Sequence, residues 1–242
     1  MADSTSTAYD LVTDPPAESR GSPAAVELAG VAHRLGHRWA LRGLTLRVEP
    51  GEVVALIGAN GSGKTTLLRI LATALVPTRG SALVFGHDLR AEPEPARAVT
   101  AMLGHATGLY DDLTAVENLR FAQEMCGAGW STAGIEAALD TVGMRDHGRT
   151  MVRTLSSGMR RRIALARLIL RRARLLLLDE PYNSFDEVGA ALVDSLVRDT
   201  ASLGGAAVVA THDLARSGGM RFDRVVALSA GRVIELASSG RK

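Results

Sequence analysis

A glycine-rich segment near residue 60 has residue types and a spacing that suit phosphate binding. It reads Gly58-Ala59-Asn60-Gly61-Ser62-Gly63-Lys64-Thr65 and matches G-x-x-x-x-G-K-[ST]. Glycines let backbone N–H groups converge on phosphate oxygens without Cβ clashes, and a following helix N-terminus adds unpaired donors and a positive dipole end. Lys64 can reach the β- and γ-phosphates of ATP, and the Thr65 hydroxyl can ligate Mg²⁺. We expect the nucleotide to be bound by Gly58, Ala59, Asn60, Gly61, Ser62, Gly63, Lys64, Thr65 and Thr66.

The alternative is a glycine-rich turn that matches the pattern by chance, and two observations argue against it. The motif stands between the apolar run Val53–Ile57 and a helix expected over residues 65–75. Of the 28 basic residues, only Lys64 and Lys242 are lysines. A planar guanidinium does not replace a compact ammonium among phosphates, so a lysine at position 64 favours a functional loop.

Two adjacent carboxylates, Asp179 and Glu180, follow the apolar run at residues 175–178. Open parallel sheets present ligands at the carboxyl ends of their strands. We expect Asp179 to hold Mg²⁺ through water and Glu180 to polarise the attacking water. Solvated acids at a strand end are the alternative, which the phosphate loop disfavours.

A histidine, His212, follows a further apolar run at residues 206–210. An imidazole at this strand end can contact the γ-phosphate and position the attacking water. The alternative is a histidine that caps a helix after the strand. We predict a catalytic role, because the position matches the family pattern described below.

The elements that position these residues alternate between strands and helices. Segments of strand length lie at residues 26–31, 44–48, Val53–Ile57, 81–85, 175–178, Ala206–Thr211, 225–228 and 233–236. Helical periodicity lies at residues 65–75, 115–126 and 132–142. Such alternation predicts an α/β fold, a mostly parallel sheet with helices on its faces.

The chain divides into a tail and one folded unit. Residues 1–24 are rich in Ser, Thr, Ala and Pro and are expected to be a disordered tail. They lack a basic stretch followed by an apolar core, so they do not form a secretory signal. The folded unit is expected at residues 25–237, with a helix-rich insert at about residues 92–160.

Composition excludes several classes of protein. The formal net charge is +2 and the arginines are scattered, so we expect no nucleic-acid partner. Cys126 is the only cysteine, which fits a reducing cytoplasm, and we expect it to pack within a helix. No apolar run reaches the ~18–20 residues that span a bilayer.

A segment between the phosphate loop and the acidic strand resembles the signature of a known family. Leu155-Ser156-Ser157-Gly158-Met159, followed by Arg160-Arg161-Arg162, resembles the LSGGQ-x-x-R signature of ATP-binding cassette (ABC) proteins. The resemblance covers about residues 26–236. It implies a P-loop NTPase fold of the ABC cassette type, with a parallel-sheet core, an antiparallel β edge and a helical subdomain. It also implies ATP and Mg²⁺ as cofactors and a head-to-tail homodimer, in which each signature meets the ATP on the other chain's loop.

The sequence departs from the family pattern at several positions. Ser157 and Met159 replace Gly and Gln of the signature, and His105 stands at the glutamine of the Q-loop. Leu35 falls where an aromatic residue often stacks on adenine, and His33, His37 or Trp39 are the possible substitutes. The D-loop reads Asn183-Ser184-Phe185-Asp186, in which only Asp186 matches well.

The strings Leu103-Gly104-His105 and LSSGMRRRIALARL resemble the haem-exporter ATPases of cytochrome c maturation. This resemblance implies an ATPase subunit that lies peripherally on the cytoplasmic face of the cell membrane and drives separate transmembrane permease subunits. The alternatives are the ATPase of another ABC exporter, for drugs, lipids or polysaccharides, a non-transport ABC ATPase, and a nucleotide-gated regulator with weak turnover.

Overall fold

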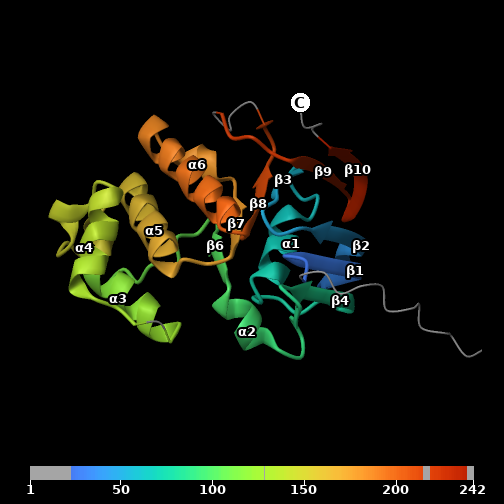
Figure 1. Cartoon of the computed structure of the whole chain (residues 1–242), viewed down its shortest axis with the longest axis horizontal. Helices are drawn as coiled ribbons and strands as arrows, with labels where there is room; N and C mark the ends of the chain where they lie inside the picture. Colours follow the sequence, from blue (N-terminus) through green and yellow to red (C-terminus); the bar gives the residue numbers. More distant parts are fainter. Residues whose placement is uncertain (1–22, 128, 215–218, 239–242) are drawn as a thin grey trace, which may run out of the picture.

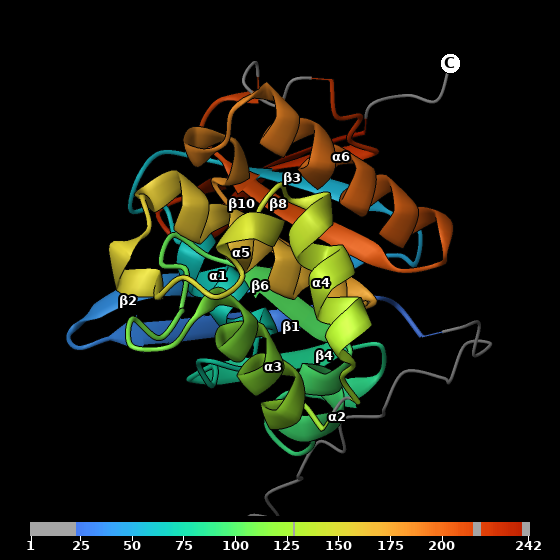
Figure 2. The ribbon, with the colours of Figure 1, turned by 90° about the vertical axis from the view of Figure 1, so that its left-hand side faces the viewer.

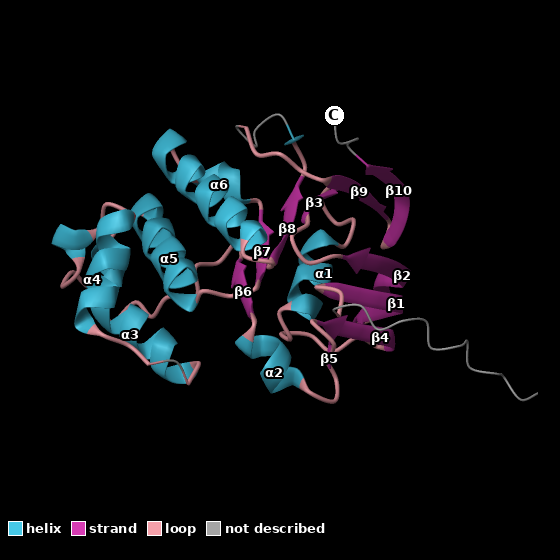
Figure 3. Cartoon of the chain, in the orientation of Figure 1, coloured by secondary structure: helices cyan, strands magenta, loops and turns pink. Residues whose placement is uncertain are grey.

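The computed structural model describes residues 23–127, 129–214 and 219–238. The expected disordered tail therefore lies outside the described residues, except for Pro23 and Ala24. Within these ranges the strands form two sheets, and most of the helices lie on one side of the molecule (Figures 1 and 3). The fold is the expected α/β cassette, with a parallel core, an antiparallel β edge and a group of helices.

The larger sheet, here called the main sheet, carries the strands that precede the predicted site. Its strands lie in the order β10 (Arg232–Ser238), β9 (Arg224–Ser229), β3 (Val53–Ile57), β8 (Ala206–Thr211), β7 (Leu175–Asp179) and β6 (Thr100–Leu103). All are parallel except β10, which is antiparallel to β9. Because parallel strands end at the same edge, the residues that follow β3, β7 and β8 meet there.

The second sheet is antiparallel and lies beside the main sheet. Its strands are β2 (Arg38–Val48), β1 (Val26–Leu35), β4 (Arg79–Val84) and β5 (His87–Asp88). β1 and β2 form a hairpin that turns at Gly36 and His37 and extends well beyond the expected segments at residues 26–31 and 44–48. Half of the added strand residues are exposed and the buried ones do not alternate regularly, so the apolar pattern is too weak to mark this length as strand.

The helices lie in layers against the main sheet. They are α1 (Lys64–Leu71), α2 (Pro93–Ala98), α3 (Ala115–Met125), α4 (Thr132–Thr141), α5 (Ser157–Arg171) and α6 (Glu187–Ser202), with 3₁₀ turns at Arg145–His147, Val152–Thr154 and Pro181–Ser184. α1 lies between the two sheets, whereas α5 and α6 cover the opposite face of the main sheet, with α3 and α4 outside α5 (Figures 1 and 2).

Strand β7 shows how the two faces of the main sheet are filled. Leu175 and Leu177 pack in the core that contains α1, and Leu176 and Leu178 pack in the core that contains α3, α5 and α6. Both faces are buried, which explains why this strand is a continuous apolar run rather than an alternating one.

The structure differs from the sequence-based expectations at three places. The helix after the loop ends at Leu71 rather than at residue 75, because Thr73 adopts a left-handed conformation with φ 59°. β6 is a strand of the main sheet inside the region expected to be helix-rich, and it lies between α2 and α3 in the sequence. Cys126, expected to pack within a helix, is exposed just after α3.

Within the described ranges, no helix is both long enough and apolar enough to cross a membrane.

Candidate nucleotide site

The phosphate loop runs from the end of β3 to the start of α1. Gly58 has φ 154°, and a Cβ there would lie 2.3 Å from the Leu228 carbonyl oxygen. Gly61 has φ 79°, and a Cβ there would meet no atom within 4 Å. Position 58 therefore requires glycine for two reasons, the close approach of the Leu228 carbonyl and the positive φ.

Lys64, the first residue of α1, places its ammonium group inside the loop. The side chain is buried, and Nζ donates to the Gly58 carbonyl at 2.5 Å and lies 3.4 Å from the Ala59 carbonyl oxygen. Nζ also lies 3.9 Å from Glu180 Oε1. The Ser62 hydroxyl in the same loop is buried and has no hydrogen-bond partner among the residues that the structure describes. Buried donors in this concave loop suit an anion.

The acidic end of β7 meets the start of α1. The Thr65 hydroxyl donates to Asp179 Oδ2 at 2.8 Å, and Asp179 is buried. Within the described residues, no three side chains of His, Cys, Asp or Glu cluster as a metal site. A hydroxyl and a carboxylate side by side still fit Mg²⁺, which prefers oxygen ligands and usually combines one or two carboxylates with substrate phosphates and water.

Glu180 and His212 lie at neighbouring strand ends, and their side chains are in contact. His212 Nδ1 lies 2.9 Å from Glu180 Oε1, and the Glu180 side chain is 17% exposed. Glu180 has φ 50°, and its backbone N–H donates to the Ala210 carbonyl at 2.8 Å. The backbone of Glu180 is thus held in a sparsely populated conformation, a feature that gathers at functional sites.

These residues surround one open cavity of about 230 Å³. Its lining consists of Leu35, Ala40, Ala59, Asn60, Gly61, Ser62, Gly63, Lys64, Thr65, Thr66, Asp179 and Glu180. The structure thus brings together nearly all of the predicted loop and both acids. His212 does not line the cavity but contacts Glu180, which does. His105 and the signature residues do not line this cavity.

Leu35 of β1 and Ala40 of β2 line the cavity from the hairpin. The possible substitutes for an adenine-stacking aromatic residue do not line it. Trp39 is contacted by the guanidinium groups of Arg34 and Arg79, at 5.5 and 5.6 Å from its ring centroid. His33 is buried, with Nδ1 3.0 Å from the Val76 carbonyl oxygen.

The predicted signature and D-loop residues stand at the N-termini of two helices. Ser156 caps α5, because its hydroxyl accepts from the Met159 N–H at 3.2 Å, and Ser157 and Gly158 are exposed. Asp186 caps α6, and Gly189 N–H and Arg162 hold the pKa of its carboxyl below the usual value. Both ends lie outside the phosphate cavity of their own chain.

The segment that follows β6 is held against α5 by arginines. Arg161 Nη1 donates to the carbonyls of Gly104 and His105 at 3.1 and 2.8 Å. Arg167 donates to the carbonyls of Thr107 and Gly108 at 2.7 and 2.9 Å. The side chain of His105 is exposed, so its role as the Q-loop residue stays a prediction.

Sequence analysis missed Arg161, although a signal was present. The residue lies three and four positions before Ala164 and Leu165, which places it on the buried face of α5. An arginine on such a face is unusual, and the run of three arginines concealed it.

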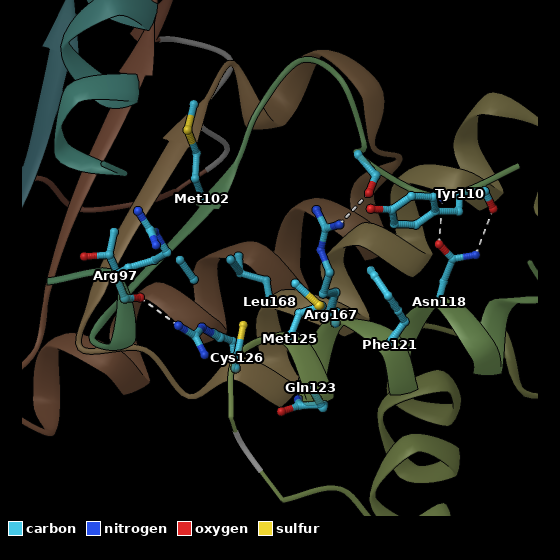
Figure 4. A pocket seen from close by; sticks show the side chains of 15 residues that line it. Arg97, Met102, Tyr110, Asn118, Phe121, Gln123, Met125, Cys126, Arg167 and Leu168 are labelled. Atoms are coloured by element: carbon cyan, nitrogen blue, oxygen red, sulfur yellow. Dashed lines mark hydrogen bonds between the residues drawn. The ribbon is translucent and has the colours of Figure 1, made fainter. Parts of the chain in front are cut away.

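A second cavity, of about 390 Å³, lies between α3, α5 and β6 (Figure 4). Its apolar lining includes Met102, Phe121, Met125 and Leu168, and Cys126 lies at its edge. Its charged lining consists of Arg97, Arg167 and Arg171, and no acidic side chain is among the described residues that line it. We call this cavity the arginine groove.

Comparison with known proteins places this geometry in a family. The family model described as ABC transporter matches residues 41–183. The chain is 41% identical over 188 residues to the cytochrome c biogenesis ATP-binding export protein CcmA of Pseudomonas aeruginosa, covering 78% of this chain and 91% of that protein. It is 40% identical over 201 residues to the protein of the same name from Bordetella bronchiseptica, covering 83% and 87%.

Solved structures agree with this assignment. The structure of an ATP-binding subunit of an ABC transporter has a TM-score of 0.80 and 26% identity, covering 89% of this chain and 90% of that one. The cassette MJ0796, a dimer bound to ADP and phosphate after hydrolysis, has a TM-score of 0.80 and 23% identity, covering 90% and 100%. The chain therefore belongs to the ABC transporter family, as an ATP-binding subunit similar to the export proteins of cytochrome c biogenesis.

Proposed function

We propose that this chain is the Mg²⁺-dependent ATPase subunit of an ABC exporter and that the exporter serves haem export in cytochrome c maturation. The observation that carries the ATPase site is the meeting of Lys64, Thr65, Asp179 and Glu180 around one cavity at the carboxyl edge of the main sheet. The names of the relatives support the export role.

Each group at the cavity has a proposed task. The backbone of the loop and the Lys64 ammonium bind the β- and γ-phosphates, and Leu35 packs beside the base. Thr65 and Asp179 hold Mg²⁺, which neutralises charge on the phosphates when bound. Glu180 orients and deprotonates the attacking water, and His212 holds the Glu180 carboxylate in place through Nδ1.

We also propose that the site is shared between two copies of the chain. Ser156, Ser157 and Gly158 lie at a helix N-terminus that is exposed and outside the cavity of their own chain. A helix N-terminus with free N–H groups binds phosphate oxygens. In a head-to-tail homodimer the signature, from Leu155 to Met159, meets the ATP on the partner chain's loop. Asp186 lies beside the signature helix of its own chain, because it forms an ion pair with Arg162 of α5. The dimeric cassette MJ0796 is consistent with such an assembly.

The membrane partners follow from the proposed export role. The chain lies peripherally on the cytoplasmic face of the membrane and is attached to transmembrane permease subunits. The arginine groove is the proposed docking site for a short helix of such a subunit. The apolar lining together with Arg97, Arg167 and Arg171 fits a helix that carries apolar and acidic side chains.

The test is the Glu180→Gln variant of the purified chain. A glutamine keeps the size of the side chain but cannot accept the proton, so we expect ATP binding and ATP-dependent dimerisation to persist. Release of phosphate should fall by about 100-fold or more. His212→Ala should also slow phosphate release while ATP still binds. ATP binding, size-exclusion chromatography and phosphate release measure the three properties.

Glu136→Gln, which removes an exposed carboxylate from α4, is the matched control and should hydrolyse ATP at the parent rate. If Glu180→Gln also hydrolysed ATP at the parent rate, Glu180 would not be the base.

A further inference from the structure

Arg161 is a buried cation whose hydrogen-bonding groups are only partly paired among the described residues. The residue is 5% exposed, and Nη1 makes its two hydrogen bonds, to the carbonyls of Gly104 and His105. Nε and Nη2 are buried and have no hydrogen-bond partner among the described residues. Within those residues, no carboxylate oxygen lies within 4.0 Å of the guanidinium group. A buried cation without a partner is costly, and such a group calls for an explanation.

The location of Arg161 gives that explanation. Leu103 of β6 pairs with Leu178 of β7, so the next residues, Gly104 and Asp179, lie side by side at the end of the sheet. The guanidinium group that binds the Gly104 carbonyl therefore lies next to the acidic end of β7. Burial lowers the pKa of Arg161, and the Asp179 carboxylate counteracts this effect. Arginine remains protonated in proteins, so the positive charge persists.

Asp179 thus has a hydrogen-bond donor on one side and a positive charge on the other. Thr65 donates to Oδ2 from the side of the phosphate loop, and the Arg161 charge lies on the side of β6 and α5. A divalent cation held by Thr65 and Asp179, as the proposed function requires, would be repelled by Arg161. Such repulsion is weakly screened in a buried site.

We propose that Arg161 is a positioning residue that weakens the hold of the site on its divalent cation and so favours release of the metal with the spent nucleotide. Its Nη1 keeps the backbone of Gly104 and His105 beside Asp179, and its charge opposes the metal. The inference rests on the proposed ATPase function. It adds to that function a role for Arg161, a residue of the signature helix, in the rate at which metal and ADP leave the site.

The test measures metal binding directly. Mn²⁺ is titrated into the protein–ADP complex of the parent and of Arg161→Gln, and free Mn²⁺ is followed by its electron paramagnetic resonance signal. Without the opposing charge, Arg161→Gln should bind Mn²⁺ at least about threefold more tightly. Release of a fluorescent ADP in the presence of Mg²⁺ should slow by a similar factor. A merely structural role predicts the opposite, weaker binding of both metal and nucleotide.

Two variants separate charge from shape. Arg161→Lys keeps the charge, so its Mn²⁺ affinity should stay within about twofold of the parent. Arg161→Met is neutral and should bind Mn²⁺ more tightly, as Arg161→Gln does. Replacement of a buried unpaired cation by a neutral residue is often tolerated, so both neutral variants should fold. Arg160→Gln removes the neighbouring, more exposed arginine, which contacts Asp111, and should leave Mn²⁺ affinity unchanged.

The outcomes distinguish this inference from the proposed function. Unchanged or weaker Mn²⁺ binding in both neutral variants, with a parent that binds Mn²⁺ and ADP, overturns the role of Arg161 alone. Equal tightening in Arg160→Gln also overturns it, because general surface charge would then be the cause. Failure of the parent to bind Mn²⁺ with ADP overturns the ATPase site itself.

Discussion

At the scale of single residues, the phosphate loop shows which positions must be glycine. Gly58 and Gly61 both have positive φ, yet only Gly58 faces a carbonyl oxygen where its Cβ would lie. Gly58 also provides the carbonyl that Lys64 binds. A side chain at position 58 would therefore displace both the strand end and the ammonium group.

Gly58→Ala should consequently remove more function than Gly61→Ala. The Cβ contact at 2.3 Å forces the backbone to move, and we expect a loss of about 2–3 kcal/mol in the free energy of unfolding together with loss of ATP binding. Gly61→Ala should lose only about 1 kcal/mol in the free energy of unfolding, because its positive φ is the only obstacle to a side chain. Chemical denaturation and binding of a fluorescent ATP analogue measure both effects. Equal effects of the two substitutions would contradict the crowding at Gly58.

At the scale of elements, α5 carries the signature at its N-terminus and lines the arginine groove near its C-terminus. Between these ends, Arg161 binds the carbonyls of Gly104 and His105 just after β6, and Arg167 binds those of Thr107 and Gly108 beside the groove. Because Arg161 and Arg167 bind carbonyls of one segment, residues 104–108, that segment should move with α5. We infer that a partner in the groove and a nucleotide in the site both act on this helix.

Arg171→Glu tests the groove as a docking site. Arg171 is near the C-terminus of α5 and lines the groove, so reversal of its charge should repel an acidic helix. We expect recovery with the membrane subunits to fall by about tenfold. The readout is the amount of this chain that co-purifies with membranes from cells that express the whole transporter. Arg198→Glu, an exposed position on α6 outside the groove, is the matched control and should be recovered like the parent. Equal recovery of the two variants would remove the groove from the interface.

At the scale of the whole molecule, one chain carries the phosphate loop of one proposed shared site and the signature of another. The phosphate cavity and the exposed signature lie at different places on the same chain. Two copies related by two-fold symmetry can complete both sites at once, because a two-fold interface uses the same surface on each partner. The proposal of a shared site predicts that two damaged chains complement one another.

Lys64→Ala and Gly158→Asp are the two variants to combine. Lys64→Ala destroys the loop and leaves the signature. Gly158→Asp places a negative charge where the partner's phosphate would arrive, and it should fold because a Cβ there meets no atom within 4 Å. Each variant alone should be inactive. Half of randomly mixed dimers are mixed, each with one complete site, so the mixture should recover up to about a quarter of parent turnover. An inactive mixture that still forms mixed dimers would contradict the shared site, and high turnover by Gly158→Asp alone would remove the signature from it.

The sequence by itself predicted which residues make up the candidate site. The loop, the acidic pair and the signature are short segments whose residue types and spacing are set by phosphate, metal and helix-cap geometry, so they are readable without a fold. The strands β3, β7 and β8 were also predictable, because each is an apolar run buried on both faces.

Only the tertiary structure decided the features that depend on distant partners. β6 is four residues long and without alternation, and it is a strand because the edge of β7 is available to it. Trp39 does not line the phosphate cavity but is contacted by Arg34 and Arg79 on neighbouring strands. The partners of Arg161, the carbonyls of Gly104 and His105, are more than fifty residues away in the sequence and became visible only in the fold. The spacing of residues within a segment determines what the segment can bind, whereas strand pairing and burial between distant segments determine which residues lie next to it.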